Sequence, residues 1–173
     1  GVRYEAAGGR AVVVPAPSGP HQRALSRLGQ VLAVAAPGFE VMQAPFDWVL
    51  WQVPALTVRQ PDLMVVNFEQ SDQPRLTSPP ALVVEVLSPT TRSVDLREKR
   101  AEYARAGAAH YWVVDLEVPS IEALVLAGDS YRTAALAKGG ETFTVDRPFP
   151  VTVAPDDLTR KGGGPWAPKA TQP

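Results

Sequence analysis

Residues 81–88 have the sequence Ala-Leu-Val-Val-Glu-Val-Leu-Ser and give the strongest strand signal in the chain. The run is short, nearly all apolar and preceded by two prolines, which is typical of a central strand buried on both faces of a sheet. Glu85 is its only charged residue. An unpaired carboxylate in such a place costs several kcal/mol, so Glu85 requires a cation, a metal ion or a hydrogen-bond donor.

A second acidic residue, Asp62, follows a proline at the start of another apolar run, residues 63–66. Strand side chains alternate between faces, so Asp62 shares a face with Met64, and Glu85 shares one with Val83. If the two strands are neighbours, both carboxylates can point at one spot. Two such charges repel unless a cation lies between them, and a divalent metal would also lower the pKa of a bound water.

Lys99 is the candidate third member of this site. We expect a helix over residues 94–106, and the four-residue spacing of Asp95, Lys99 and Tyr103 puts these side chains on one face of it. A lysine near a metal-bound water can orient the water or stabilise the charge that develops on phosphorus. Two strand carboxylates with a nearby lysine therefore predict a metal-dependent phosphodiesterase site.

Each of these residues also has a purely structural interpretation. Asp95 and Lys99 can form an exposed ion pair of little energetic consequence. Glu85 can form a buried salt bridge with an arginine such as Arg59 or Arg100, and an aspartate that follows a proline is common in turns. A structural ion cluster without catalysis is thus an alternative to the active site.

The rest of the chain predicts a mixed α/β domain with few helices and a large sheet. Strands are expected at residues 10–14, 39–53 (one or two strands), 56–68 (interrupted at Pro61), 81–87 and 110–115, and in a meander over 121–126, 130–136 and 141–145. Helices are expected from Ser18 to Ala36 and, capped by Ser93 and closed by Gly107, from Val94 to Ala106, with a loop over 69–80. We expect one domain over residues 1–160 and a flexible Gly/Pro-rich tail over residues 161–173.

The composition restricts the chemistry of the site. The chain of 173 residues has no cysteine and two histidines, which excludes disulfides and thiolate sites and argues against a multi-histidine zinc site. A metal would be held by oxygen ligands, as suits magnesium or manganese. The net charge of −1 argues against a large basic surface but leaves room for a local patch. No apolar run is long enough to span a bilayer and no secretory signal is present, so we expect no membrane contact and a cytoplasmic protein.

Two groups of residues are candidates for contacts with DNA or a partner. Arg92, Arg97 and Arg100 give the central helix a basic cast that suits phosphate contacts, although a solvated face balanced by glutamates explains them equally. Four aromatic residues could stack on bases, but their strand settings favour core packing or a subunit interface; they are Trp48, Trp51, Tyr111 and Trp112.

Five segments, in order along the chain, resemble the Uma-two family of restriction-endonuclease-like proteins within the PD-(D/E)XK nuclease superfamily. These segments are Pro61–Val66, Pro79–Pro89, Asp95–Lys99, Tyr103–Gly107 and Tyr111–Asp115. Arg3-Tyr4-Glu5, Gly9-Arg10 and His21-Gln22-Arg23 resemble the opening strands and first helix of that family. The family's usual leading helix is absent, so we expect an incomplete N-terminus.

The resemblance implies roles for individual residues. Asp62, Glu85 and the carbonyl of Val86 would be metal ligands. The superfamily's standard motif has lysine where this chain has Leu87, and the resemblance implies that Lys99, on the following helix, takes that role. The supporting residues that it implies near the site are Glu5, His21, Asp95 and Tyr103.

The same resemblance implies a restriction-endonuclease-like α/β fold, in which helices flank a central mixed β-sheet. The implied activity is magnesium- or manganese-dependent hydrolysis of phosphodiester bonds in DNA by an endonuclease. The alternative is a catalytically inactive relative that keeps the fold for DNA binding or assembly. Because double-strand cleavage needs two sites, we expect a symmetric homodimer.

Overall fold

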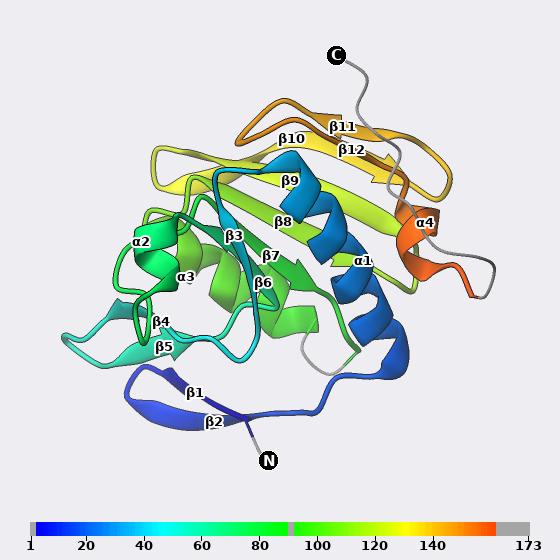
Figure 1. The fold of residues 1–173 in the computed structure, drawn as a ribbon. Helices are drawn as coiled ribbons and strands as arrows, with labels where there is room; N and C mark the ends of the chain where they lie inside the picture. The colour runs from blue at the N-terminus through cyan, green and yellow to red at the C-terminus, as the bar shows by residue number, and fades with distance from the viewer. Residues whose placement is uncertain (1–2, 90–91, 162–173) are drawn as a thin grey trace.

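A central six-stranded mixed sheet organises the computed structural model of this chain, which describes residues 3–89 and 92–161 (Figure 1). Its strand order is β10-β9-β8-β7-β6-β3, and β7 and β8 are parallel while the other neighbours are antiparallel. The strands are β3 (Glu40–Gln43), β6 (Leu63–Val66), β7 (Leu82–Val86), β8 (His110–Asp115), β9 (Ser120–Ala127) and β10 (Ser130–Lys138). The expected fold class, a mixed sheet flanked by helices, is confirmed.

Strand β7 is the predicted central strand, and all five of its residues are buried. It lies between β6 and β8, so both of its edges are paired. Its side chains alternate between two cores: Val84 packs on the face toward α1, and Val83 packs on the face toward α3. The near-continuous apolar sequence of the strand follows from this burial on both faces.

Helix α1 (Gly19–Ala35) covers one face of the central sheet. As expected, Ser18 caps it, because the Ser18 side chain accepts a hydrogen bond from the backbone N–H of His21 (3.4 Å), and a proline stands in the first turn. Leu25, Leu28 and Leu32 are buried and pack the helix on the sheet. This packing fixes the orientation of the first helical turn, where His21 lies.

The other face is covered by a π-helix, η1 (Val94–Lys99), which continues as α3 (Arg100–Arg105). The expected single α-helix is thus wider over its first six residues. The expected cap at Ser93 is wrong, because Ser93 itself has helical dihedral angles (φ −69°, ψ −35°) and its side chain makes no capping hydrogen bond. Gly107 ends the segment with φ of +83°, as predicted for a left-handed C-terminal glycine.

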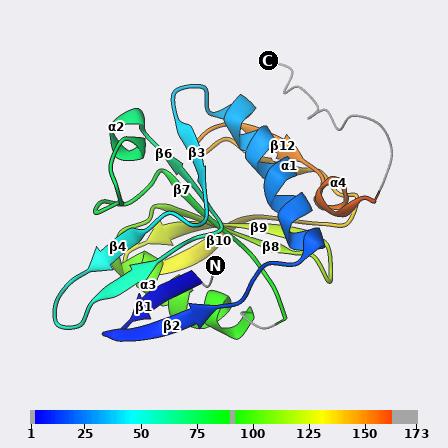
Figure 2. The ribbon, with the colours of Figure 1, turned by 60° about the horizontal axis from the view of Figure 1, so that its bottom comes forward.

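A second sheet, of four strands in the order β2-β1-β5-β4, lies on the α3 side of the molecule (Figure 2). Its strands are β1 (Arg3–Ala7), β2 (Arg10–Val14), β4 (Trp48–Trp51) and β5 (Thr57–Arg59). The strand region expected over residues 56–68 is therefore two strands in different sheets. Pro61 separates them, because proline cannot donate to a strand ladder.

Three short elements were not expected from the sequence. Helix α2 (Phe68–Ser71) begins the predicted loop, β12 (Val151–Val153) pairs with β11 (Phe143–Val145), and α4 (Pro155–Thr159) packs near α1. The predicted flexible tail lies, beyond Lys161, outside the described residues. None of the helices in the described part of the chain is long and apolar enough to cross a membrane.

Candidate active site

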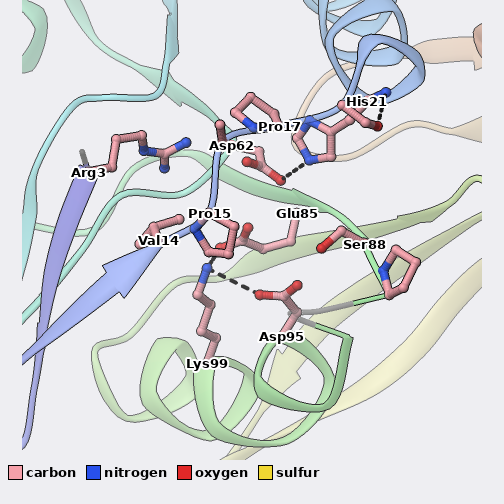
Figure 3. A pocket seen from close by; sticks show the side chains of 13 residues that line it. Arg3, Val14, Pro15, Pro17, His21, Asp62, Glu85, Ser88, Asp95 and Lys99 are labelled. Carbon is pink, nitrogen blue, oxygen red and sulfur yellow. Dashed lines mark hydrogen bonds and ion pairs between the residues drawn. The ribbon is translucent and has the colours of Figure 1, made fainter. Parts of the chain in front are cut away.

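The pairing of β6 with β7 brings Asp62 and Glu85 together. The antiparallel register sets Leu63 opposite Val84, which places the preceding Asp62 beside the following Glu85. Both line a pocket of about 180 Å³ at this end of the two strands (Figure 3). The prediction that the two carboxylates face one spot rests on this register.

Asp62 contacts Val86, the last residue of β7, and the imidazole of His21. The N–H of Val86 donates to Oδ2 of Asp62 (2.9 Å), and Nε2 of His21 lies 3.1 Å from the same oxygen. The same Nε2 lies 3.0 Å from the carbonyl oxygen of Val86. The two atoms that the sequence implied as metal ligands, one on Asp62 and one on Val86, thus flank a single histidine nitrogen.

Lys99 and Tyr103, on the helical segment of η1 and α3, provide the hydrogen-bond partners of Glu85. Oε1 of Glu85 accepts hydrogen bonds from Nζ of Lys99 (3.0 Å) and from the hydroxyl of Tyr103 (2.6 Å). Lys99 also reaches Oδ1 of Asp95 (3.1 Å) and Oε1 of Glu5 (3.7 Å), as Figure 3 shows for Asp95. The helix face that carries Asp95, Lys99 and Tyr103 therefore points toward the acidic pair. The alternative of an exposed ion pair between Asp95 and Lys99 is excluded, because both residues are buried.

The arginine alternative for Glu85 is also excluded. Arg59 instead donates to Oε2 of Glu5 (3.0 Å) and makes two hydrogen bonds to the carboxylate of Glu102 (2.7 and 2.9 Å). Nothing local in the sequence indicated this cluster beyond a single arginine in an apolar segment. These contacts join β1, β5 and α3 and fix Glu5 next to Lys99.

Around Lys99, three carboxylates share one ammonium group. Burial and the charges of Asp62 and Asp95 raise the pKa of Glu85 well above its ordinary value, although Lys99 opposes the shift. The pKa of Lys99 is also raised, because its three carboxylate neighbours outweigh the cost of its burial. One lysine shared among three carboxylates cannot neutralise all of them. Glu85 therefore resists ionisation unless a further cation is present.

The pKa of Asp62 is lowered and the pKa of His21 is raised, as expected of an acid and a base that are hydrogen-bonded to each other. Burial alone would raise the pKa of Asp62, but the hydrogen bond and charge of His21 and the N–H of Val86 lower it. Burial alone would lower the pKa of His21, but its contacts with Asp62 and the carbonyl of Val86 raise it. Asp62 is thus the carboxylate of the pair that stays ionised.

The donor set fits a hard divalent cation. Two carboxylates and a backbone carbonyl are oxygen donors, which hard divalent cations prefer. The residues that could hold such an ion are Asp62, Glu85 and Val86. Among the described residues, no three histidine, aspartate or glutamate side chains are grouped closely enough to hold a metal by themselves, and the family resemblance adds the carbonyl of Val86 to the two carboxylates.

The remaining lining residues come mainly from the segment between β2 and α1. Residues 14–18 pass along the pocket, and Pro15 and Pro17 stand over it in Figure 3. Arg3 also lines the pocket, and its guanidinium donates to the side chain and the backbone carbonyl of Gln60 (both 3.2 Å). Arg3 was not identified as a site residue from the sequence, because nothing local connects it to residues 62 and 85.

The predicted DNA-contacting arginines lie in three different settings. Arg92 pairs with Asp115 (2.7 Å), Arg100 donates to the carbonyl of Tyr131 (3.3 Å), and Arg97 is exposed. Three of the four aromatic candidates belong to the core, as preferred from the sequence; they are Trp48, Tyr111 and Trp112. The fourth, Trp51, is half-buried, and the guanidinium of Arg105 lies 4.4 Å from its ring centre.

Comparison with known proteins identifies the family and the fold of this chain. The family model Uma2, described as "Putative restriction endonuclease", matches residues 1–159. The chain belongs to the Uma2 family, the Uma-two family that the sequence resembles. A solved structure of "a putative nuclease belonging to DUF820" from Anabaena variabilis matches with a TM-score of 0.72 and 15% identity, over 90% of this chain and 89% of the other. At that identity the likeness concerns the fold. No curated protein matches.

Proposed function

We propose that this Uma2 protein is a metal-dependent DNA endonuclease of the PD-(D/E)XK type. The observation that carries the proposal is the convergence of Asp62, Glu85 and Lys99 on one pocket, where three carboxylates share the ammonium group of Lys99. The family description supports a nuclease, and the fold of the DUF820 relative supports the same architecture.

Each residue has a role that follows from its contacts. Asp62, Glu85 and the carbonyl of Val86 would hold magnesium or manganese, which when bound supplies a Lewis acid and a more acidic water. Lys99 presents its ammonium group beside Glu85 (3.0 Å), where it can hold an attacking water or stabilise charge on phosphate. Its position on η1 supplies the lysine that Leu87 replaces in the standard motif.

Three further residues position this group. The hydroxyl of Tyr103 donates to Glu85, and Asp95 and Glu5 hold the ammonium group of Lys99 from two other sides. Lys99 is held by three carboxylates and reaches Glu85 from the following helix. This arrangement supports an active nuclease over an inactive relative. The inactive DNA-binding alternative is favoured by Leu87, where the standard motif has lysine, and by the net charge of −1.

The test is cleavage of supercoiled plasmid DNA with magnesium, with manganese and with a chelator. We expect cleavage that requires a divalent ion and falls by about a hundredfold or more in Asp62→Asn, Glu85→Gln and Lys99→Met. His110→Ala is the control, because His110 lies on the opposite part of the sheet and lines a different pocket. Cleavage that survives the chelator, or that the three variants share with the wild type, would contradict the proposal.

A further inference from the structure

The roles proposed above do not explain the contacts of His21. Its side chain is buried, with 6% of the residue exposed, and it comes from the first turn of α1, which Ser18 caps. Nε2 lies 3.1 Å from Oδ2 of Asp62 and 3.0 Å from the carbonyl oxygen of Val86. Figure 3 shows the ring pointing into the pocket toward Asp62.

These distances match the spacing of adjacent ligands around one metal ion. In an octahedral site with bonds of about 2.1 Å, ligands at right angles are separated by about 3.0 Å. The nitrogen of His21 stands at that separation from both oxygens. Nε2 therefore stands at the spacing of an adjacent ligand from each of the two oxygen atoms.

Hydrogen bonding alone explains the arrangement less fully. A carbonyl oxygen only accepts, so Nε2 must carry the ring hydrogen and divide it between two acceptors. Nδ1 of His21 is buried and has no hydrogen-bond partner within the described residues. It lacks one whichever ring nitrogen carries the hydrogen, so Nδ1 does not distinguish the two arrangements. The distinction rests on what Nε2 contacts.

We propose that Nε2 of His21 is a nitrogen ligand of the metal that Asp62 and the Val86 carbonyl hold, and that this ligand makes the site prefer manganese to magnesium. The inference rests on the proposed metal-dependent function and extends it to the choice of metal. On coordination, the neutral ring carries its one hydrogen on Nδ1 and offers the lone pair of Nε2 to the metal; a ring protonated at both nitrogens releases the Nε2 proton to solvent. Magnesium favours oxygen ligands throughout, whereas an imidazole nitrogen favours transition metals.

The composition makes this inference testable without measuring DNA cleavage. The chain has two histidines, and the second, His110, lines a pocket that shares no residue with this one. Manganese is titrated calorimetrically into the wild type, Asp62→Asn, His21→Ala and His110→Ala, with magnesium in parallel and folding checked by circular dichroism. Electron spin echo envelope modulation of the manganese protein, prepared with ordinary and with ¹⁵N-labelled histidine, detects a directly bound histidine nitrogen.

We expect a histidine-nitrogen modulation in the wild type and in His110→Ala that changes with ¹⁵N labelling. His21→Ala should lose it and bind manganese at least about tenfold more weakly, while magnesium affinity changes less. Should His21→Ala fail to fold, the modulation in the wild type and in His110→Ala decides.

Manganese binding that needs Asp62 but shows no nitrogen modulation would overturn the role of His21 and leave the proposed function intact. A folded wild type that binds neither metal would overturn both.

Discussion

At the scale of single residues, the site depends on one lysine buried among acids. Lys99 is 7% exposed and contacts Glu5, Glu85 and Asp95. Removing one partner of a buried ion pair leaves uncompensated charge and typically costs about 3–5 kcal/mol. The network is therefore a stability element as well as the proposed catalytic group.

We predict that Lys99→Met lowers the free energy of unfolding by about 3 kcal/mol without metal, because the remaining carboxylates repel one another. Urea unfolding followed by circular dichroism measures the loss. Arg97→Met is the matched control, since Arg97 is exposed on the same helical segment and should cost little. Equal losses in the two variants would show that the network contributes nothing special.

Asp115, which does not line the candidate site, offers a prediction about the pH dependence of stability. Its Oδ1 accepts from the N–H of Glu117 (2.9 Å) and of Val118 (3.4 Å), and its Oδ2 pairs with Arg92. Burial opposes ionisation, but these donors lower the pKa of Asp115. Because the folded-state pKa is depressed, the stabilisation is fully present above the unfolded value of about 3.9 and is lost as pH falls through the folded value.

Asp115→Asn should therefore cost about 1 kcal/mol at neutral pH and progressively less below about pH 4. Urea unfolding of both proteins across that range gives the difference in free energy. A cost that does not change with pH would mean that the charge of Asp115 contributes nothing.

At the scale of elements, Gly107 ends the segment that carries Lys99. Its φ of +83° is a left-handed conformation, and a side chain there would also meet Pro79 at 3.6 Å. We predict that Gly107→Ala destabilises the protein by about 1 kcal/mol. Gly19→Ala is the control, because Gly19 begins α1 and an added Cβ there has no neighbour within 4 Å. Thermal unfolding of both variants measures the difference, and the prediction is wrong if the two behave alike.

Elements with a strong local signal were predictable. The apolar run of β7 and the cap and leucine spacing of α1 fix their identity without knowledge of the partner. Strand pairing is not local, which is why the division of residues 56–68 between two sheets and the short β12 were missed. The π-helical turns at Val94–Lys99 were missed because the four-residue spacing of Asp95 and Lys99 suits an α-helix equally well.

At the scale of the whole molecule, the site joins residues that the fold brings together from distant segments. Asp62, Glu85 and Lys99 could be predicted because each lies in a sharp local pattern. His21 was named only through the family resemblance, and it reaches Asp62 across 41 positions of sequence. The contact of His21 with Val86 and the link from Arg59 to Glu102 depend on how α1 and the second sheet dock, which no local pattern encodes.

The homodimer stays a prediction at this scale. Cutting both DNA strands needs two sites, and a two-fold dimer supplies them. Sedimentation velocity over a range of concentrations should show a species of twice the chain mass, with or without a short duplex. A strictly monomeric protein that nonetheless makes double-strand breaks would contradict this prediction.

The most direct test of the central claim is anomalous diffraction from crystals soaked in manganese. The account predicts one strong peak in the pocket, about 2.2 Å from Oδ2 of Asp62 and from the carbonyl oxygen of Val86, with Glu85 facing it. The peak should vanish in crystals of Asp62→Asn. Manganese bound elsewhere, or no peak beside Asp62 at concentrations that support cleavage, would contradict the assignment of this pocket as the metal-dependent nuclease site.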